Sequence, residues 1–178
     1  MRSVLVIVAA VALSAVAAEA QEFDSNAYYR LTTQFRGPDM ALDVYNGGAK
    51  NNMTHLAPAQ DVSGQYWNLR PTGDDYYRLT TMFRGRKMCL DVVNGGTRNN
   101  QLQIARCANY SGQFWRITPI NGGYHLTTQF RGPDMCLDIY NGGRDNNEPH
   151  LTDCADFSGQ IWSLQDTDKT VGPSRGGY

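Results

Sequence analysis

Three aspartates occupy the same position in three copies of one repeated sequence segment, which is called the repeated word below. Asp43, Asp91 and Asp138 each stand in a Leu-Asp-Val or Leu-Asp-Ile segment that runs into an Asn-Gly pair. Successive side chains of a strand point to opposite faces, so an aspartate between two apolar core residues faces outward. Such a carboxylate can accept hydrogen bonds from a polar ligand, or it can bond backbone N–H groups of its own turn. The pattern leaves both interpretations open.

The word that carries these aspartates spans residues 31–48, 79–96 and 126–143. Each copy is followed by Ser-Gly-Gln-x-Trp, and the three tryptophans, Trp67, Trp115 and Trp162, are 48 and 47 residues apart. A period of about 20 to 50 residues is typical of units that bury their apolar face only against one another. The sequence therefore predicts three repeats, at about residues 28–75, 76–122 and 123–165.

One repeat contains the signals of four short strands. In the first repeat, near-alternation of apolar and polar residues predicts strands at 28–35 and 40–45, through 55–57, and at 65–69. Residues 36–39 are expected to turn, and Asn46 with the two glycines after it suits a tight reversal. No helical period of useful length is visible after the first 20 residues. We therefore expect an all-β fold of about twelve strands that is closed or nearly closed, because closure removes exposed edges.

The two ends differ from the repeats. A basic start, an apolar run over residues 4–16 and Ala18-Glu19-Ala20 predict a secretory signal peptide, residues 1–20. Residues 21–27 are expected to be a lead-in, and the polar residues 166–178 a flexible tail. We predict a secreted product, extracellular, or periplasmic in a Gram-negative host, without membrane insertion. The net charge of −1 does not favour a nucleic-acid partner.

Four cysteines refine the repeat. Cys89 and Cys107 are 18 residues apart, as are Cys136 and Cys154, and both matching positions of the first repeat hold alanine. Four cysteines allow three pairings. Because the first repeat lacks both cysteines together, a bond within each of the other two repeats is favoured. A metal site is the alternative, but the C-x-x-C spacing typical of zinc sites is absent. We expect no metal and no cofactor.

The Gln-x-Trp residues have a structural interpretation. The tryptophans alternate with apolar residues at period two, so we expect them in the core. Buried polar side chains need hydrogen-bond partners, so the glutamines are expected to bond backbone groups. The glutamines are Gln65, Gln113 and Gln160.

Three phased Leu-Asp-Val/Ile segments, each closed by Gln-x-Trp, resemble the ricin B-chain-like β-trefoil lectins. The resemblance covers about residues 28–164. It implies a six-stranded barrel capped by three hairpins with pseudo-threefold symmetry, intra-repeat disulfides, and up to three shallow carbohydrate sites. In those lectins the Asp binds the sugar, with help from a Gln or His on the third strand, an aromatic ring and an Asn.

Carried over by position, this ligand set is only half present. The Gln/His place holds His55, Gln103 and His150, which agrees with the family. The aromatic place holds Ala57, Ala105 and Thr152, and the Asn place before Gln-x-Trp holds Gly64, Gly112 and Gly159, which depart from it. The resemblance therefore implies glycan binding without implying a simple galactose site.

Rings for sugar stacking must then come from other positions. Tyr45 and Tyr140 follow their aspartates by two residues, where the second repeat has Val93. Tyr110 and Phe157 lie in the loop before Gln-x-Trp, where the first repeat has Val62. The predicted carbohydrate-binding residues are Asp43, Tyr45, Asn46 and His55; Asp91, Asn94 and Gln103; and Asp138, Tyr140, Asn141 and His150. Repeat three has the most complete set.

Catalysis is not expected. An enzyme needs unlike groups at one place, whereas the recurrent polar residues here occupy symmetry-related positions that a threefold fold holds apart. We expect a non-catalytic binder of glycans or polysaccharide that acts multivalently. A protein-binding or inhibitory trefoil without sugar activity is the alternative, and the sequence does not indicate the oligomeric state.

Overall fold

The computed structural model describes residues 23–172, and within that range the chain is all-β. The described residues contain twelve strands and four 3-10 turns, joined by loops, and no α-helix. The predicted twelve-stranded fold is confirmed. The predicted signal peptide lies outside the described residues, as do residues 173–178 of the predicted tail. No helix in the described part is long and apolar enough to span a membrane.

Six strands form a closed barrel. Each pairs with two others in the ring β1, β4, β5, β8, β9, β12 and back to β1. The ring strands are β1 (Ala27–Thr33), β4 (Trp67–Gly73), β5 (Tyr76–Thr81), β8 (Trp115–Ile120), β9 (Gly123–Thr128) and β12 (Trp162–Thr170). Closure leaves no free sheet edge in the barrel.

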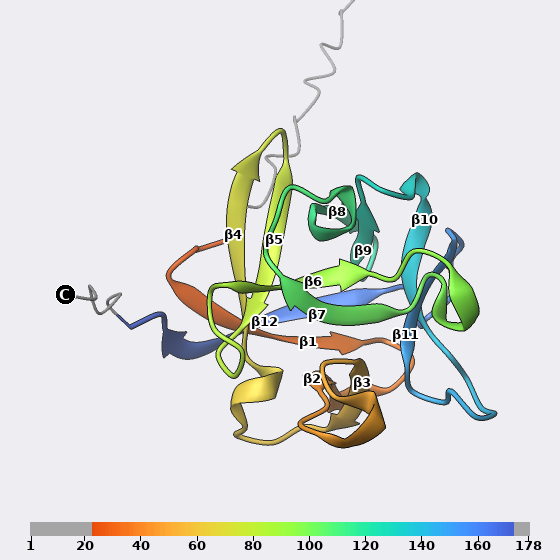
Figure 1. The fold of residues 1–178 in the computed structure, drawn as a ribbon, viewed down its shortest axis with the longest axis horizontal. Coiled ribbons are helices and arrows are strands. Elements are labelled where there is room, and N and C mark those ends of the chain that lie inside the picture. The colour runs from red at the N-terminus through yellow and green to blue at the C-terminus, as the bar shows by residue number, and fades with distance from the viewer. Residues whose placement is uncertain (1–22, 173–178) are drawn as a thin grey trace, which may run out of the picture.

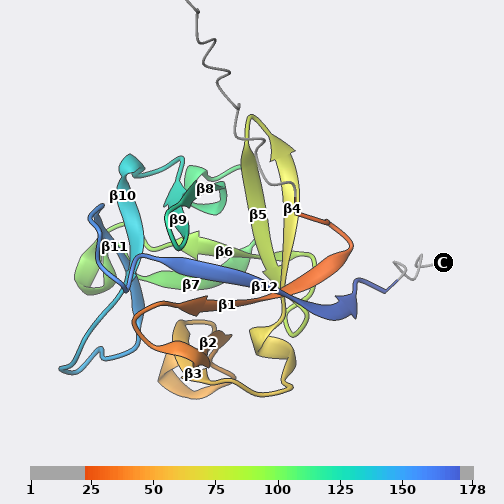
Figure 2. The same cartoon turned by 180° about the vertical axis from the view of Figure 1, so that it is seen from behind.

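Three antiparallel hairpins, one per repeat, complete the fold. They are β2 (Gly37–Val44) with β3 (Thr54–Pro58), β6 (Met88–Val92) with β7 (Leu102–Arg106), and β10 (Gly132–Ile139) with β11 (Pro149–Asp153). In Figure 1 the β2–β3 hairpin lies below the barrel strands and the β10–β11 hairpin to their right. Figure 2, which views the molecule from behind, shows β12 running across the front just above β1. The 3-10 turns are η1 (Gly48–Lys50), η2 (Ser63–Gln65), η3 (Gly96–Arg98) and η4 (Ser111–Gln113).

Three tryptophans fill the core. Trp67, Trp115 and Trp162 are each 0% exposed. Their indole N–H groups donate to the backbone carbonyls of Leu42, Leu90 and Leu137 at 2.8–3.0 Å. Each tryptophan therefore ties its barrel strand to the strand that carries the recurrent aspartate, because that leucine directly precedes the aspartate.

The lead-in is part of the core, which corrects the predicted domain boundary. Phe23 is buried and meets the rings of Tyr29, Tyr77 and Tyr124 edge-on, with centroids 5.5–5.8 Å apart. These tyrosines come from β1, β5 and β9, one from each repeat. A single ring thus fills a space that three symmetric units leave between them, and no repeated pattern marks it.

Two local boundaries also differ from the sequence prediction. Residues 34–36 form the first turn, and Gly37, at φ 70°, begins β2, so the chain is already extended at Pro38 and Asp39. Residues 63–65 form η2, because the Gln65 side chain accepts from the Gln60 N–H and donates to the Pro58 carbonyl, and β4 begins only at Trp67. Side-chain bonding to the backbone competes here with the strand ladder.

The predicted tail also begins too early. Residues 166–170 continue β12 and pair with β1, with Ala27 opposite Thr170. Asp166, Asp168 and Thr170 are exposed, while Thr167 and Lys169 on the other face are half-buried.

Both disulfides favoured by the sequence are present. Cys89–Cys107 and Cys136–Cys154 each close within one repeat, with Cα atoms 5.0 and 4.8 Å apart. In each pair, one cysteine lies on the first strand of a hairpin and the other directly follows the second strand. The bonds therefore close the base of the hairpins of repeats two and three.

Candidate functional site

Each recurrent aspartate is held by two hydrogen bonds. One carboxylate oxygen of Asp138 accepts from the backbone N–H of Ile139 at 2.7 Å, and the other accepts from the Gln160 side chain at 3.0 Å. Asp43 and Asp91 make the equivalent bonds to Val44 and Gln65, and to Val92 and Gln113, at 2.7–3.1 Å. A carboxylate offers about four acceptor positions. Each aspartate is therefore fixed in direction and still has acceptor capacity for a ligand.

The glutamine of Gln-x-Trp links three groups. Gln160 is fully buried; its amide nitrogen donates to Asp138 and to the Asp153 carbonyl, and its oxygen accepts from the Ala155 N–H at 2.8 Å. The same pattern recurs in the other two repeats. The glutamine orients the aspartate and has little freedom left to contact a ligand.

The glycine before that glutamine is required by the aspartate. A Cβ built on Gly159 would lie 2.2 Å from the near carboxylate oxygen of Asp138, and the corresponding distances at Gly64 and Gly112 are 2.1 and 2.6 Å. Such distances are far shorter than any contact between these atoms. At the position where the resembling lectins have Asn, this protein therefore needs a glycine, because any larger side chain would collide with the aspartate.

The third-strand residue lies directly opposite the aspartate. Asp43 pairs with His55, Asp91 with Gln103 and Asp138 with His150 in the hairpin register. In repeats one and three the histidine ring stacks on the tyrosine two residues beyond the aspartate, with centroids 3.8 and 3.6 Å apart and planes 7° from parallel. The tyrosines are Tyr45 and Tyr140, so each of these rings has one face covered by histidine.

Burial decides the protonation of these histidines. It lowers the pKa of His55 and of His150, although Asp43 and Asp138 act in the opposite direction. Burial, with the charges of Asp145 and Glu148, raises the pKa of Tyr140. Both imidazoles are therefore neutral at pH 7, with one nitrogen able to donate and the other to accept.

A phenylalanine from another repeat lies beside each site, which the sequence analysis missed, and Phe83 and Phe130 line the hollows of repeats one and two. The backbone N–H groups of Phe83 and Phe130 donate to the Ser63 and Ser111 carbonyls at 3.1 and 3.2 Å. Phe35 closes the cycle by donating to Ser158 at 3.0 Å. The signal was the Phe-Arg-Gly of the repeated word, whose partner lies in the preceding repeat.

The arginine that follows each phenylalanine fixes this ring. Arg84 lies 4.1 Å from the centroid of the Phe83 ring and donates to the Asn51 side chain at 2.7 Å. Asn51 in turn accepts from the Gly47 N–H at 2.8 Å, within the turn that follows Asp43. The same arrangement of an arginine over a phenylalanine ring, bonded to a turn asparagine, recurs in the other two cases. There Arg131 bonds to Asn99, and Arg36 bonds to Asn146. Each site is therefore assembled from two repeats.

Hollows open beside the aspartates of repeats one and two. Over repeat two, a hollow of about 470 Å³ is lined by Asp91, Asn94, Gln103, Tyr110 and Phe130, among others. Over repeat one, about 240 Å³ is lined by residues that include Asp43, Asn46, Val62 and Phe83. The loop residue is well exposed in every repeat, 38% for Val62 and 64% for both Tyr110 and Phe157.

The predicted site residues are only partly brought together. In repeat one, Asp43 and Asn46 share the hollow, while Tyr45 and His55 stack on each other and do not line it. In repeat two, Asp91, Asn94 and Gln103 all line it. In repeat three, Asp138 lies opposite His150, Tyr140 stacks on that histidine, and Asn141 is exposed.

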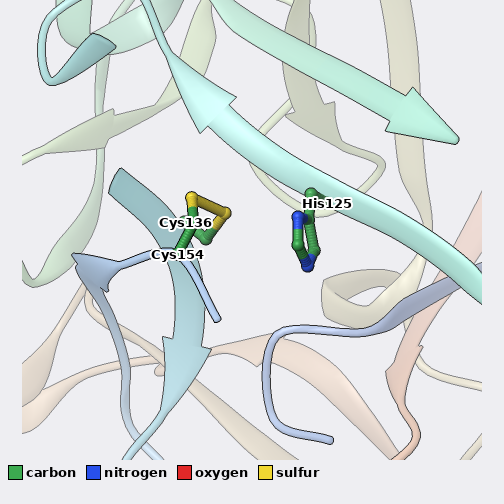
Figure 3. Close-up of side chains that lie close together, drawn as sticks. All are labelled: His125, Cys136 and Cys154. Atoms are coloured by element: carbon green, nitrogen blue, oxygen red, sulfur yellow. A yellow bond between two sulfur atoms is a disulfide. The ribbon is translucent and has the colours of Figure 1, made fainter. Parts of the chain in front are cut away.

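One group of metal-ligand types lies elsewhere in the molecule. Figure 3 shows His125 beside Cys136 and Cys154. The ligand atoms of the three residues lie within 4.8 Å of one another. The two sulfurs are bonded to each other. A metal needs the free thiolate, so this group is a disulfide with a neighbouring imidazole.

The fold has several relatives among solved structures. The designed threefold-symmetric protein ThreeFoil is 26% identical with a TM-score of 0.66, over 78% of this chain and 98% of that one. The ricin B-like lectin of Macrolepiota procera, solved with lactose, is 17% identical with a TM-score of 0.65, over 82% and 99%. The exo-β-1,3-galactanase 1,3Gal43A of Clostridium thermocellum is 22% identical with a TM-score of 0.64, over 83% of this chain and 32% of that one. The β-trefoil architecture is therefore shown.

Sequence comparison gives the family. No curated protein matches the chain at a significant level. The profile of the family described as ricin-type beta-trefoil lectin domain-like matches residues 63–153, from the second half of repeat one into repeat three, just over half of the chain. This protein is a member of the ricin-type β-trefoil lectin domain-like family.

Proposed function

We propose that this protein is a secreted, non-catalytic lectin with three glycan sites, one beside each recurrent aspartate. The observation that carries the proposal is the threefold recurrence of one arrangement. Each repeat holds an oriented carboxylate near an exposed turn asparagine, and a phenylalanine of another repeat bonds through its backbone N–H to the loop beside it. Shallow, polar sites with an aromatic wall suit sugars, which offer hydroxyl groups on their edges and apolar C–H faces.

The family and the fold support a binding role over catalysis. The exo-galactanase relative is about three times as long as the part that this chain covers, so the fold also occurs within a larger enzyme chain. In the part of this chain that the structure describes, the polar groups of the three sites are equivalent rather than unlike. Two disulfides suit an oxidising compartment. Three sites on one rigid body would raise the apparent affinity for a glycan-coated surface.

The exposed turn asparagines allow a clean test. Asn46, Asn94 and Asn141 are exposed, and the first two line the hollows, so changing them to alanine removes ligand contacts without opening the core. On an immobilised glycan panel, each single variant should weaken retention and the triple variant should abolish it. Asn121→Ala, in the exposed turn between β8 and β9, is the matched control and should bind as the parent does. Undiminished binding by the triple variant would refute the assignment of these sites.

A further inference from the structure

Two arginines face each other across neighbouring barrel strands. Arg70 on β4 lies directly opposite Arg78 on β5 in the antiparallel register. Like charges in this position destabilise a sheet. The corresponding pairs of the other two repeats are Arg30 with Gln165 and His125 with Thr118. Of these three pairs, only the one between the last strand of repeat one and the first strand of repeat two therefore has two permanent positive charges.

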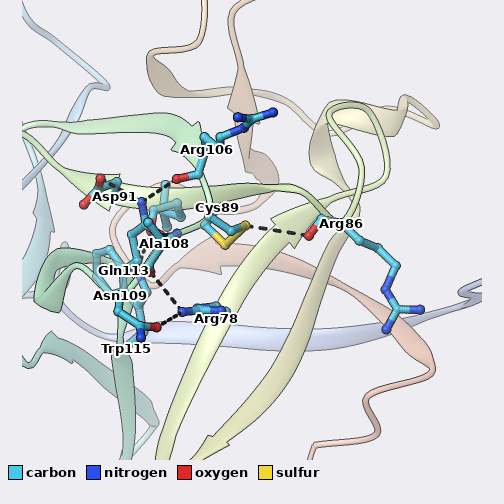
Figure 4. The surroundings of a disulfide bond; sticks show 11 residues. Arg78, Arg86, Cys89, Asp91, Arg106, Ala108, Asn109, Gln113 and Trp115 are labelled. Atoms are coloured by element: carbon cyan, nitrogen blue, oxygen red, sulfur yellow. Dashed lines mark hydrogen bonds between the residues drawn. A yellow bond between two sulfur atoms is a disulfide. The ribbon is translucent and has the colours of Figure 1, made fainter.

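Nothing among the described residues neutralises this pair. The two ion pairs found there join Lys50 to Glu148 and Lys169 to Asp61. Arg78 donates to the Ala108 carbonyl and to the Asn109 side chain, both at 2.9 Å, as Figure 4 shows. Burial, followed by the charges of Arg86 and Arg78, lowers the pKa of Arg70. The positive charge at Arg70 is thus disfavoured by its surroundings as they stand.

The two arginines line a hollow of about 420 Å³ together with Pro71, Thr72, Asn109 and Phe114. No carboxylate lines it. The Phe114 ring lies 5.1 Å from the Arg78 guanidinium and so holds it in place. Asn109 also lines the hollow beside Asp91. The arginine hollow and the proposed glycan site of repeat two therefore share a wall.

We propose that Arg70 and Arg78 form an oxyanion subsite that extends the glycan site of repeat two toward glycans carrying a sulfate or carboxylate. A guanidinium presents donors in the geometry that such groups accept, often in pairs. A bound oxyanion also relieves the repulsion between the two arginines. The subsite depends on the function proposed above, because the anion belongs to a glycan held beside Asp91.

The test compares neutral and charged forms of the same sugar. Immobilised lactose, 3′-sulfolactose and 3′-sialyllactose are probed with the full protein, with Arg70→Gln, and with Arg30→Gln. Arg70→Gln introduces the glutamine that stands at the corresponding position, Gln165, and Arg30→Gln removes one positive charge from the corresponding pair between β1 and β12. The parent and Arg30→Gln should bind both charged forms about tenfold tighter than lactose, the ratio expected from one charge-assisted hydrogen bond. Arg70→Gln should bind all three forms alike.

Free sulfate provides a second readout that needs no sugar. At equal ionic strength, replacing sodium chloride by sodium sulfate should raise the unfolding temperature of the parent more than that of Arg70→Gln. The comparison between the two proteins removes the general stabilising effect of sulfate. An equal rise in both would overturn the subsite.

The outcomes separate the two proposals. If the parent binds lactose but shows no preference for the charged forms, the subsite is overturned and the lectin function stands. If Arg30→Gln loses the preference as well, general charge explains it and the subsite is overturned. If no neutral or charged member of a wider glycan panel is retained, the lectin function fails and the glycan subsite with it. Tighter binding of a single-stranded RNA than of 3′-sulfolactose would also overturn the glycan assignment.

Discussion

Replacing Gly159 by alanine tests how the aspartate site is built. The new Cβ would lie 2.2 Å from the near oxygen of Asp138, so the carboxylate or the turn must move. The backbone of Gly159 has no left-handed φ, so the cost comes from this contact alone. Moving the carboxylate breaks its bonds to the Ile139 N–H and to Gln160.

The change in the free energy of unfolding caused by Gly159→Ala is the sum of opposing contributions. Removing a glycine from the unfolded chain stabilises a protein by about 0.4–1 kcal/mol. Overpacking costs about 1–3 kcal/mol, and each weakened hydrogen bond adds about 0.5–1.5 kcal/mol. We therefore expect a net loss of about 2 kcal/mol in the free energy of unfolding. For a chain of this length, that loss lowers the unfolding temperature by roughly 4–8 °C.

Urea unfolding of the purified protein measures this loss of stability, and retention on the glycan panel measures whether the site still binds. Gly159→Ala should lower the urea midpoint and weaken glycan retention. Gly172→Ala is the control, because its Cβ would meet nothing within 4 Å and its φ is ordinary. A Gly159→Ala protein with the stability and the glycan retention of the parent would refute the packing argument.

Two further predictions concern the hairpins. The double variant Cys136→Ala, Cys154→Ala reproduces the alanines Ala41 and Ala59 of repeat one, so the protein should still fold. Its free energy of unfolding should be lower by about 3 kcal/mol. An unchanged urea midpoint would contradict this prediction. Burial lowers the pKa of His150 in the folded state, so the unfolded chain binds more protons just below pH 6.5 and stability should fall as the pH drops through that region. His150→Gln, the residue type that repeat two has at Gln103, should flatten this dependence in urea titrations between pH 5 and 7, and an identical slope in both proteins would count against it.

The repeat, the strand pattern and the disulfides could be predicted because their signals are local or periodic. The alternation around Asp43 identifies the buried Leu42 and Val44 within a few residues. The Cys89–Cys107 bond followed from comparing equivalent positions of the repeats. The predicted start of the flexible tail at residue 166 was wrong because residues 166–170 are polar, and only their pairing with β1 makes them part of a strand.

The candidate site was predictable only in part. The aspartate and the residue opposite it, such as Asp138 and His150, lie in one hairpin, so their proximity can be predicted from the strand register. The asparagine expected before Gln-x-Trp was judged missing, whereas the contact between Gly159 and Asp138 gives that position a packing role. A sequence position carries no information on the atoms that approach it from a segment about 20 residues away.

The sequence by itself determined the three repeats, the all-β class and the cysteine pairs, because each is set by spacing within one unit, whereas the expected outward direction of the aspartates does not hold for Asp91, which is buried. Only the tertiary structure decided which groups meet across units. Phe83 lines the site of repeat one, Phe23 packs between three tyrosines, and Arg70 faces Arg78 with no ion pair to either from residues 23–172. These contacts depend on how the barrel closes. Closure brings the end of one repeat against the start of the next, and no local pattern encodes the partner that it supplies.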